Sequence, residues 1–357
     1  MRPTIRDVAK RAGVSPATVS RILSGGTSAV RISAATRARV LQLSAEIGYT
    51  PDARASSLRS QRSRLVGVIA RDITQASAAV LIAVLDEVLK QHGYELLLAQ
   101  GQAVSGLDQF PEAFDRHRVN GVIFVGTPHD SADSAVLGEY TRRLHRHVVG
   151  LTYGGALQLP VSIHSDNGLG VRLAVDHLLA LGHRSIAFAG APITHSVKQR
   201  QATFQAYTAA LHGVTAAVEV GRELSARTGG EVMQRLLARP DAPTAIIFAN
   251  DEMAIGGMMA AYQAGRAVPH SLSIVGFDDI PLASGCWPAL TTLRKPVRPM
   301  AEQVVTSLIE LMENGSATAA DGHQQGATEP HREYLFPPEL IVRGSTAPPG
   351  GCSPAYP

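Results

Sequence analysis

A short helix face near the beginning of the chain carries side chains that suit contact with the edges of nucleic-acid bases. Residues 16–23 are predicted to form a helix in which Val19, Ile22 and Leu23 make an apolar stripe. The opposite face is polar and is made of Ser15, Ala17, Thr18, Ser20 and Arg21. Small residues at a helix start allow close approach to base edges, and an arginine can donate two hydrogen bonds to one guanine in the major groove. The alternative interpretation is an ordinary helical hairpin with a solvated polar face.

A second set of polar residues follows the apolar runs of strand length in the rest of the chain. Open parallel α/β sheets bind ligands at the carboxyl ends of their strands, where loops and helix N-termini converge. Carboxylate and amide groups bind adjacent hydroxyls, and arginine offers a planar pair of donors, so this set suits a polyhydroxylated ligand. The candidates are Asp72, Thr74, Thr127, His129, Asp166, Arg200, Asn250, Asp251, Asp278 and Asp279.

Some of these side chains have a structural alternative. Asp251 is interpreted as the cap of a helix at 252–265, and Asp279 suits a turn position. Trp287, the single tryptophan, suits either stacking on a sugar face or filling a space in the core or at a hinge.

Two short helices joined by a tight turn must position the first polar face. Thr4 and Asp7 have the spacing of a capping box at the start of the first helix, and Gly13 suits the left-handed conformation that ends it. Ser15 is placed to cap the second helix, and Pro16 follows at a position where no backbone N–H is needed.

A third helix is predicted from about residue 34 to residue 46, capped by Ser33 and ended by Gly48. Its apolar residues, with Ile47 after it, close a three-helix core over the first two helices. Arg31 lies on the preceding loop, where arginine commonly meets a phosphate.

The charge of the chain is divided unevenly along its length. Residues 1–64 carry 12 Lys+Arg against 3 Asp+Glu, a balance of +9, whereas the remainder carries 21 against 27, a balance of −6. A basic head on a mildly acidic body is typical of a module that binds a phosphate backbone.

From residue 65 onward, apolar runs of strand length alternate with helical stretches. Continuous apolar strands between amphipathic helices indicate parallel sheets covered on both faces. The number of repeats favours two similar α/β subdomains that split near residue 161. Residues 314–332 are polar and glycine-rich and are predicted to be a loop, and the Pro- and Gly-rich end of the chain is predicted to be disordered.

Residues 4–24, which include DVAKRAGVS and ATVSRIL, resemble the helix-turn-helix of the lactose/galactose repressor family. The likeness continues through IGYTPDARASSLRSQRSRLVGVI (47–69), DNGLGVRLAVDHLLALGHRSIAFAG (166–190), IIFANDEMAIGGM (246–258) and LSIVGFDDIPLASGCWPALTTLRKP (272–296). It implies a helix-turn-helix head of three helices, a hinge helix, and a periplasmic-binding-protein-like α/β core of two parallel-sheet subdomains.

The resemblance also implies the binding residues. A nine-residue hinge helix is marginal alone and orders only when it is held. In the family it pairs with its dimer mate and enters the minor groove, where Leu58 matches the wedge between base pairs. The residues expected to contact DNA are Thr4, Ser15, Pro16, Ala17, Thr18, Ser20, Arg21, Arg31, Arg54, Ala55 and Leu58. Those expected to contact the effector are Asp72, Thr74, Thr127, Asp166, Arg200, Asn250, Asp278 and Trp287.

The expected domains are a helix-turn-helix domain at 1–50, a hinge at 51–63, a core at 64–345 and a disordered tail at 346–357. Within the core, the N-subdomain is expected at about 64–160 plus 293–325, and the C-subdomain at about 161–292 plus 326–345. The resemblance has one clear departure: Thr74-Gln75-Ala76-Ser77 stands where many members carry aromatic residues that pack on the ligand.

The expected function is a ligand-responsive, homodimeric transcriptional regulator, most simply a repressor, of a near-palindromic operator. Corepressor or activator behaviour with a non-sugar effector such as a nucleobase is the alternative, and a solute-binding protein for sugar uptake is the rival from another class. Enzyme motifs are absent, and no cofactor or metal is expected, because Cys286 and Cys352 are too few for a cysteine-based site. With no apolar segment long enough to span a membrane and no signal peptide, the expected location is cytoplasmic, at the nucleoid.

Overall fold

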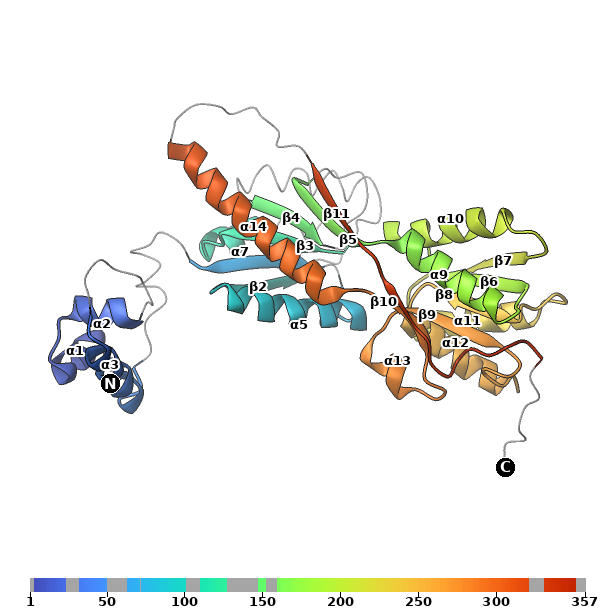
Figure 1. The fold of residues 1–357 in the computed structure, drawn as a ribbon, viewed down its shortest axis with the longest axis horizontal. Helices are drawn as coiled ribbons and strands as arrows, with labels where there is room; N and C mark the ends of the chain where they lie inside the picture. Colours follow the sequence, from blue (N-terminus) through green and yellow to red (C-terminus); the bar gives the residue numbers. More distant parts are fainter. Residues whose placement is uncertain are drawn as a thin grey trace. The chain divides into compact units, whose positions relative to one another are not determined.

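The computed structural model describes residues 3–23, 32–49, 63–70, 72–100, 110–126, 147–151, 159–320 and 331–350. The chain divides into two compact units between Arg64 and Leu65. Figure 1 labels the elements of both units.

The first unit contains three helices around a small apolar core. They are α1 (Ile5–Ala12), α2 (Pro16–Leu23) and α3 (Ala34–Glu46). The core residues are Val8, Ala9, Ala12, Val19, Ile22 and Val40. The apolar faces predicted for all three helices are therefore confirmed.

Local hydrogen bonds fix the ends of these helices as predicted. The carboxylate of Asp7 accepts from the backbone N–H of Thr4 at 2.8 Å and from its hydroxyl at 2.7 Å. These bonds lower the pKa of the Asp7 carboxyl. Gly13 has a φ of 67° and Gly48 a φ of 68°, the left-handed region that glycine adopts at little cost.

The second unit begins with a six-stranded parallel sheet in the order β11-β5-β4-β3-β1-β2. Its strands are β1 (Leu65–Ala70), β2 (Glu95–Gln100), β3 (Gly121–Val125), β4 (His147–Leu151), β5 (Val161–Ser165) and β11 (Arg332–Phe336). Helices α5 (Ala76–Gln91) and α14 (Val297–Ala320) pack on one face, and α7 (Phe110–Arg116) packs on the other.

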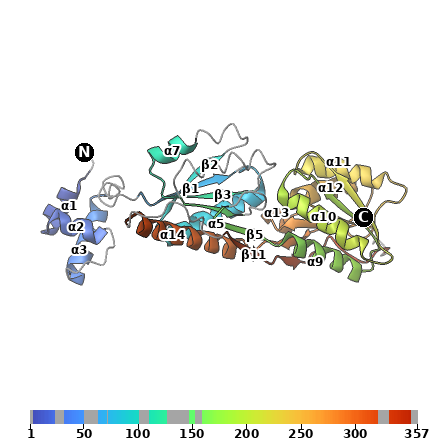
Figure 2. The ribbon, with the colours of Figure 1, turned by 90° about the horizontal axis from the view of Figure 1, so that it is seen from above.

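A second six-stranded sheet has the order β12-β10-β9-β8-β6-β7, with β12 antiparallel to β10. Its strands are β6 (Ser185–Gly190), β7 (Thr215–Val220), β8 (Ala245–Phe248), β9 (Ser273–Asp278), β10 (Thr291–Arg294) and β12 (Glu339–Ile341). Helices α9 (Asn167–Ala180) and α10 (His195–Ala209) lie together on one face, and α11 (Ala226–Leu237) and α12 (Asp251–Gln263) cover the other (Figure 2). The short helix α13 (Pro281–Gly285) follows β9.

The chain crosses between the two sheets three times, at positions that differ from the expected ones. Strand β5 belongs to the first sheet, so the first crossing follows residue 165 rather than residue 160. The second crossing follows Arg294, and the third follows Phe336 rather than residue 325. Each shift arises because a short strand is hydrogen-bonded to the sheet that the chain is about to leave.

Two further expectations about the end of the chain are wrong in part. Helix α14 continues to Ala320, so the predicted loop at 314–332 is helical in its first part. Ser345 accepts from the backbone N–H of Ile274 at 2.8 Å, and the carbonyl of Ala347 lies 2.9 Å from Nε2 of the buried His183. The first residues of the predicted tail are therefore packed, whereas residues 351–357 lie outside the described residues.

Candidate functional site

The outer face of α2 lies at the surface of the first unit, as the sequence predicts. Ser15, Ala17 and Arg21 are exposed, and Thr18 and Ser20 are half-buried. The Ser15 hydroxyl caps the helix, because its oxygen accepts from the Thr18 backbone N–H at 3.1 Å. A hydroxyl used in this way is held in a fixed direction at the helix start.

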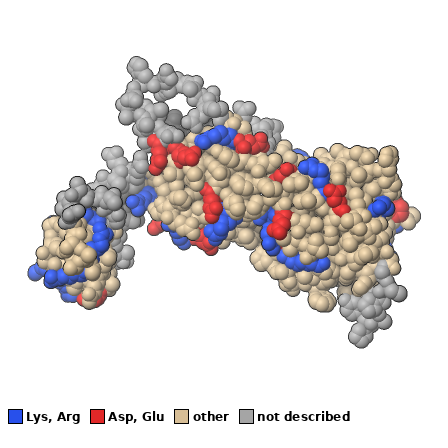
Figure 3. Space-filling model, viewed as in Figure 1, with Lys and Arg blue, Asp and Glu red and all other residues tan. Residues whose placement is uncertain are grey.

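Cationic side chains are frequent on the surface of the head. Blue Lys and Arg side chains outnumber red acidic ones on the side of the head that Figure 3 shows. The exposed Thr4 also lies on the head, at the start of α1, and Pro16 opens α2. The remaining predicted DNA contacts, Arg31, Arg54, Ala55 and Leu58, lie outside the described residues.

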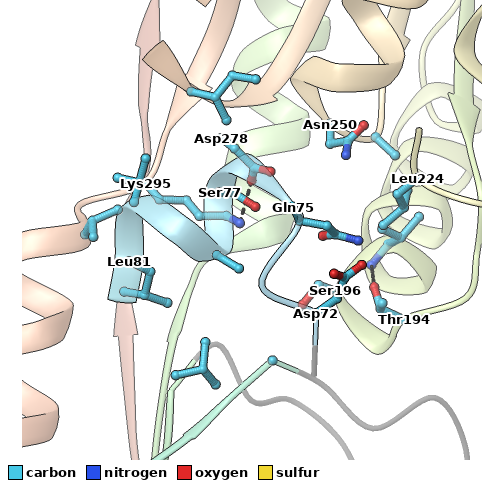
Figure 4. Close-up of a pocket in the computed structure, with 18 of the residues that line it drawn as sticks. Asp72, Gln75, Ser77, Leu81, Thr194, Ser196, Leu224, Asn250, Asp278 and Lys295 are labelled. Atoms are coloured by element: carbon cyan, nitrogen blue, oxygen red, sulfur yellow. Dashed lines mark hydrogen bonds and ion pairs between the residues drawn. The ribbon is translucent and has the colours of Figure 1, made fainter. Parts of the chain in front are cut away.

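A pocket of about 370 Å³ lies in the second unit, lined by residues of both sheet layers (Figure 4). Four predicted ligand-binding residues line it, namely Asp72, Arg200, Asn250 and Asp278. Asp72 follows β1 of the first sheet, whereas the other three belong to the second sheet and its helices. These four residues therefore lie around one pocket, and their role as effector contacts stays a prediction.

Arg200 is 3% exposed and is fixed on several sides. Its Nε donates to Oδ1 of Asn167 at 2.8 Å, and its Nη1 donates to the carbonyl of Ala249. The guanidinium carbon lies 3.5 Å from the centre of the Phe277 ring, and Nη2 lies 3.8 Å from Oδ1 of Asp278. Burial lowers the pKa of this guanidinium, and Asp278 opposes that effect. A planar, buried cation is thus held at the wall of the pocket.

Lys295 is a pocket residue that the sequence reasoning missed. It follows β10 on the second crossing, and its Nζ lies 2.5 Å from Oδ1 of Asp278. Burial lowers the pKa of the Lys295 ammonium; Asp278 raises it and Arg200 lowers it further. The position of a lysine directly after a strand, at LRKP, is the signal that could have identified it.

Asn250 and Asp251 have different structural roles: the first caps a helix and the second accepts buried hydrogen bonds. Asn250, not Asp251, caps α12, because its Oδ1 accepts from the Met253 backbone N–H at 3.0 Å. Asp251 is the first helical residue and is fully buried. It accepts from the Ile280 backbone N–H at 2.8 Å and from the Thr292 hydroxyl, and burial raises the pKa of its carboxyl to about 7. The expected capping role of Asp251 is therefore wrong.

Asp279 lines the pocket as well, and its role exceeds that of a turn residue. Its φ is 58°, and its carboxylate pairs with Arg294 and with Arg343, each at 2.6 Å. The preceding Asp278 also has a positive φ, 117°. A backbone in this sparsely populated region, held by several side chains, is frequent at binding sites.

Three predicted effector contacts do not line the pocket. Thr74 donates from its backbone N–H and its hydroxyl to Oδ1 of Asp72, at 2.9 and 2.6 Å. Asp166 caps α9 by accepting from the Leu169 N–H at 2.8 Å. Trp287 follows α13 and is 85% exposed. Thr127 and His129 lie outside the described residues.

Other polar residues of the pocket were not anticipated, and most come from the starts of helices. The segment that opens α5 contributes Gln75 and Ser77, and the start of α10 contributes Thr194 and Ser196. No aromatic side chain of the described residues lines the pocket.

Within the described residues, no group of three His, Cys, Asp or Glu side chains is arranged to hold a metal ion. None of the described helices is both long and apolar enough to cross a membrane.

Comparison with known proteins identifies the family. A model of bacterial regulatory proteins of the lacI family matches residues 4–52, and a model of the periplasmic binding protein-like domain matches residues 175–346. The transcriptional regulator MalR of Streptomyces coelicolor is 35% identical over 357 residues, which cover 97% of each chain. The chain belongs to the lacI family. The transcriptional repressor CytR of Escherichia coli is 30% identical and covers 96% of each chain.

A solved structure extends this family assignment to the whole fold. The crystal structure of the Lac repressor dimer bound to operator and the anti-inducer ONPF superposes with a TM-score of 0.76 at 27% identity. The match covers 97% of this chain and 100% of that one. As a member of the lacI family, the chain is a helix-turn-helix transcriptional regulator with an effector-binding core, and the family consists of regulators rather than enzymes.

Proposed function

We propose that this regulator is a repressor that binds a near-palindromic operator as a homodimer, and that a small polar ligand in the core pocket controls its operator affinity. The observation that carries the proposal is a pocket lined by charged residues from both sheets, in a chain that also exposes a capped, arginine-bearing helix. A solute-binding protein would need the pocket but not the basic head.

On the DNA side, the exposed face of α2 is assigned to the major groove. Arg21 is the residue assigned to read a base, because it can donate two hydrogen bonds to one guanine. Thr4, Ser15, Pro16, Ala17, Thr18 and Ser20 are assigned to approach the bases or the flanking phosphates. Arg31 is assigned to a phosphate, and Arg54, Ala55 and Leu58 of the hinge to the minor groove.

Coupling between ligand and DNA follows from the position of the pocket. A ligand that contacts both sheets and their helices stabilises one orientation of the first sheet relative to the second over other orientations. If that arrangement also changes operator affinity, ligand and operator must alter each other's affinity by the same factor. An inducer and a corepressor use the same pocket and differ only in which arrangement they favour.

The lining of the pocket supports a polyhydroxylated ligand, such as a sugar or a sugar acid. Asp72, Gln75, Asn250 and the hydroxyls of Thr194 and Ser196 offer donors and acceptors for several hydroxyl groups. A nucleobase would need a stacking partner, and the described lining contains no aromatic ring.

The first test is a thermal-unfolding screen of the full chain against sugars, sugar acids and nucleobases, followed by operator binding with each hit. A ligand at 100 times its Kd stabilises the folded state by about 2.7 kcal/mol, which shifts Tm by several degrees. The Asp278→Ala variant is expected to bind operator as the wild type does and to lose the ligand response. A retained response in this variant would remove Asp278 from the ligand site.

The DNA-reading assignment has its own test. Arg21→Ala is expected to lose roughly 1–3 kcal/mol at one base pair and to relax specificity there. The measurement is selection of operator sequences from random duplex DNA, followed by titration with single-base variants. An equal loss for every DNA sequence would assign Arg21 to a phosphate instead.

A further inference from the structure

Two buried cations at the pocket share one carboxylate oxygen. Lys295 Nζ lies 2.5 Å from Oδ1 of Asp278, and Nη2 of Arg200 lies 3.8 Å from the same atom. The side chains of Lys295 and Arg200 are 18% and 4% exposed, so water screens them little. One negative charge therefore faces two positive charges inside the protein.

The neighbouring carboxylates do not restore the balance. Both oxygens of Asp279 are engaged, one by Arg294 and the other by Arg343. Asp251 accepts from Ile280 and Thr292, and with a pKa of about 7 it carries only part of a charge near neutral pH. The group of Arg200, Lys295, Asp278 and Asp251 thus has a net charge between zero and +1.

The ammonium group of Lys295 has three N–H bonds, and among the described residues its one ion pair is with Asp278. Its Nζ also lies 6.0 Å from the centre of the Phe277 ring. Lys295 and Asp278 line the pocket, together with the hydroxyl-bearing Ser77 (Figure 4). A buried donor that faces a cavity favours a ligand with an acceptor at that point.

The opposite side of the pocket has different chemistry. In Figure 4, Asp72, Thr194 and Ser196 are separated from the Lys295–Asp278 pair. The Asp72 carboxylate is bound on one oxygen by Thr74, and no cation is paired with it among the described residues. This side suits hydroxyl groups, whereas the Lys295 side suits an anion.

We propose that the effector carries an anionic group, a carboxylate or a phosphate, that binds the ammonium of Lys295 and Nη2 of Arg200, with its hydroxyl groups directed toward Asp72. Lys295 is then the residue that selects a charged ligand over its neutral parent. The proposal rests on the proposed function, since it concerns the same pocket.

The experiment uses the full chain and four anions with a neutral reference. Inorganic phosphate, D-gluconate, D-glucuronate and D-glucose 6-phosphate are compared with D-glucose by titration calorimetry and thermal unfolding, at constant ionic strength set with chloride. Phosphate is expected to bind saturably, and one or more of the sugar anions to bind at least about tenfold more tightly than glucose. The sugar acids and the sugar phosphate distinguish the two sources of the anion.

Variants assign the effect to one side chain. Lys295→Gln is expected to lower the affinity for the preferred anion at least about tenfold, and Lys295→Arg to retain most of it. The matched control is Lys90→Gln, which removes a Lys–Asp pair of 2.6 Å on the surface of α5 and should change nothing. If Lys295→Gln does not fold, the affinities of the wild type for the anions and for glucose still test whether the pocket prefers an anionic ligand.

Several outcomes would overturn the proposal: no saturable binding of any of the four anions, glucose binding as tightly as the anions, or equal anion binding by Lys295→Gln and the wild type. Operator titrations with the same compounds separate this failure from that of the proposed function. An operator response to glucose alone leaves the proposed function intact and removes the anionic effector. Failure of the wild type to select a palindromic operator removes the proposed function itself.

Discussion

Asp251 illustrates how one buried carboxyl can organise a binding site without lining it. It holds the Ile280 backbone N–H and the Thr292 hydroxyl, so it ties the start of α12 to the turn after β9 and to β10. That turn presents Asp278 and Asp279 to the pocket. Burial, together with the nearby Asp278 carboxylate, raises the pKa of the Asp251 carboxyl to about 7, and the two hydrogen bonds oppose this effect.

The raised pKa predicts a definite dependence of stability on pH. Since the pKa in the folded state, about 7, lies above the ordinary value of 3.8, the folded protein retains a proton that the unfolded chain releases. The free energy of unfolding should therefore fall as the pH rises from about 4 to about 7 and then level off. At 1.36 kcal/mol per pKa unit, the contribution is at most about 4 kcal/mol.

Replacement of Asp251 by Asn should remove this contribution, because the amide does not titrate. Urea unfolding across the same pH interval is expected to give a flatter profile for Asp251→Asn than for the wild type. Parallel profiles would show that another group carries the pH dependence.

At this scale, the end of a long apolar strand predicted Asp278, which lines the pocket. Arg200 lines the pocket too, but it lies within α10 and was predicted from the family resemblance. Lys295 was missed because it follows β10, whose four residues, TTLR, do not form an apolar run. Trp287 was expected near the ligand because it lies close to Asp278 in sequence, but it follows α13, does not line the pocket and is exposed.

Helices α11 and α12 approach each other closely because glycines line their contact. A Cβ added at Gly229 would lie 2.0 Å from the carbonyl oxygen of Met253, and one added at Gly256 would lie 1.8 Å from that of Ala226. Backbone meets backbone at both points, so no side chain can move aside. The start of α12, which carries Asn250, is thereby set at a fixed distance from α11.

Gly256→Ala is expected to destabilise the core, although alanine normally favours a helix by about 1 kcal/mol over glycine. The forced separation of two packed helices should outweigh that gain and leave a net loss of about 1–3 kcal/mol. Chemical denaturation measures the loss. Gly285→Ala is the control, because nothing lies within 4 Å of its added Cβ, and an equal effect of the two changes would contradict the close-packing account.

The elements that sequence reasoning missed share a physical cause. Strands such as β5 (VSIHS) and β11 (REYLF) mix polar and apolar residues, because they lie toward one edge of the first sheet, and β7 (TAAVEV) forms an edge of the second. Central strands such as β3 and β8 are buried on both faces and read as continuous apolar runs. The crossing points were misplaced because they depend on which sheet accepts these short strands, a long-range choice that local periodicity does not record.

At the scale of the whole core, a hydrogen bond beside the pocket links the helices of the first sheet to those of the second. Glu252, at the start of α12, accepts from the backbone N–H of Ala76 at the start of α5, at 2.9 Å. The neighbouring residues Gln75 and Asn250 both line the pocket. A carboxylate at a helix N-terminus is favourably placed with respect to the helix dipole, so this contact stabilises the arrangement that encloses the pocket.

Glu252→Ala is expected to weaken ligand binding about fivefold, which corresponds to a hydrogen bond of about 1 kcal/mol. The reason is that the arrangement in which both layers contact the ligand becomes less populated. Titration calorimetry with a ligand identified by the screen measures the change. Glu252→Gln, which keeps an acceptor oxygen, should bind nearly as the wild type does, and identical affinities for Glu252→Ala and Glu252→Gln would exclude this role.

The three crossings between the sheets set an order in which the protein can be completed during its synthesis. The three helices of the head lie within the first 49 residues, so their contacts are available as soon as that stretch has left the ribosome. Neither sheet is complete until much later: the first lacks β11 until residue 336 has been made, and the second lacks β12 until residue 341. Since chains emerge from the N-terminus and domains fold as units, the nascent chain carries its DNA-binding module long before its ligand-binding one. A message truncated before codon 332 would thus encode the head attached to two sheets that each lack a strand at one edge.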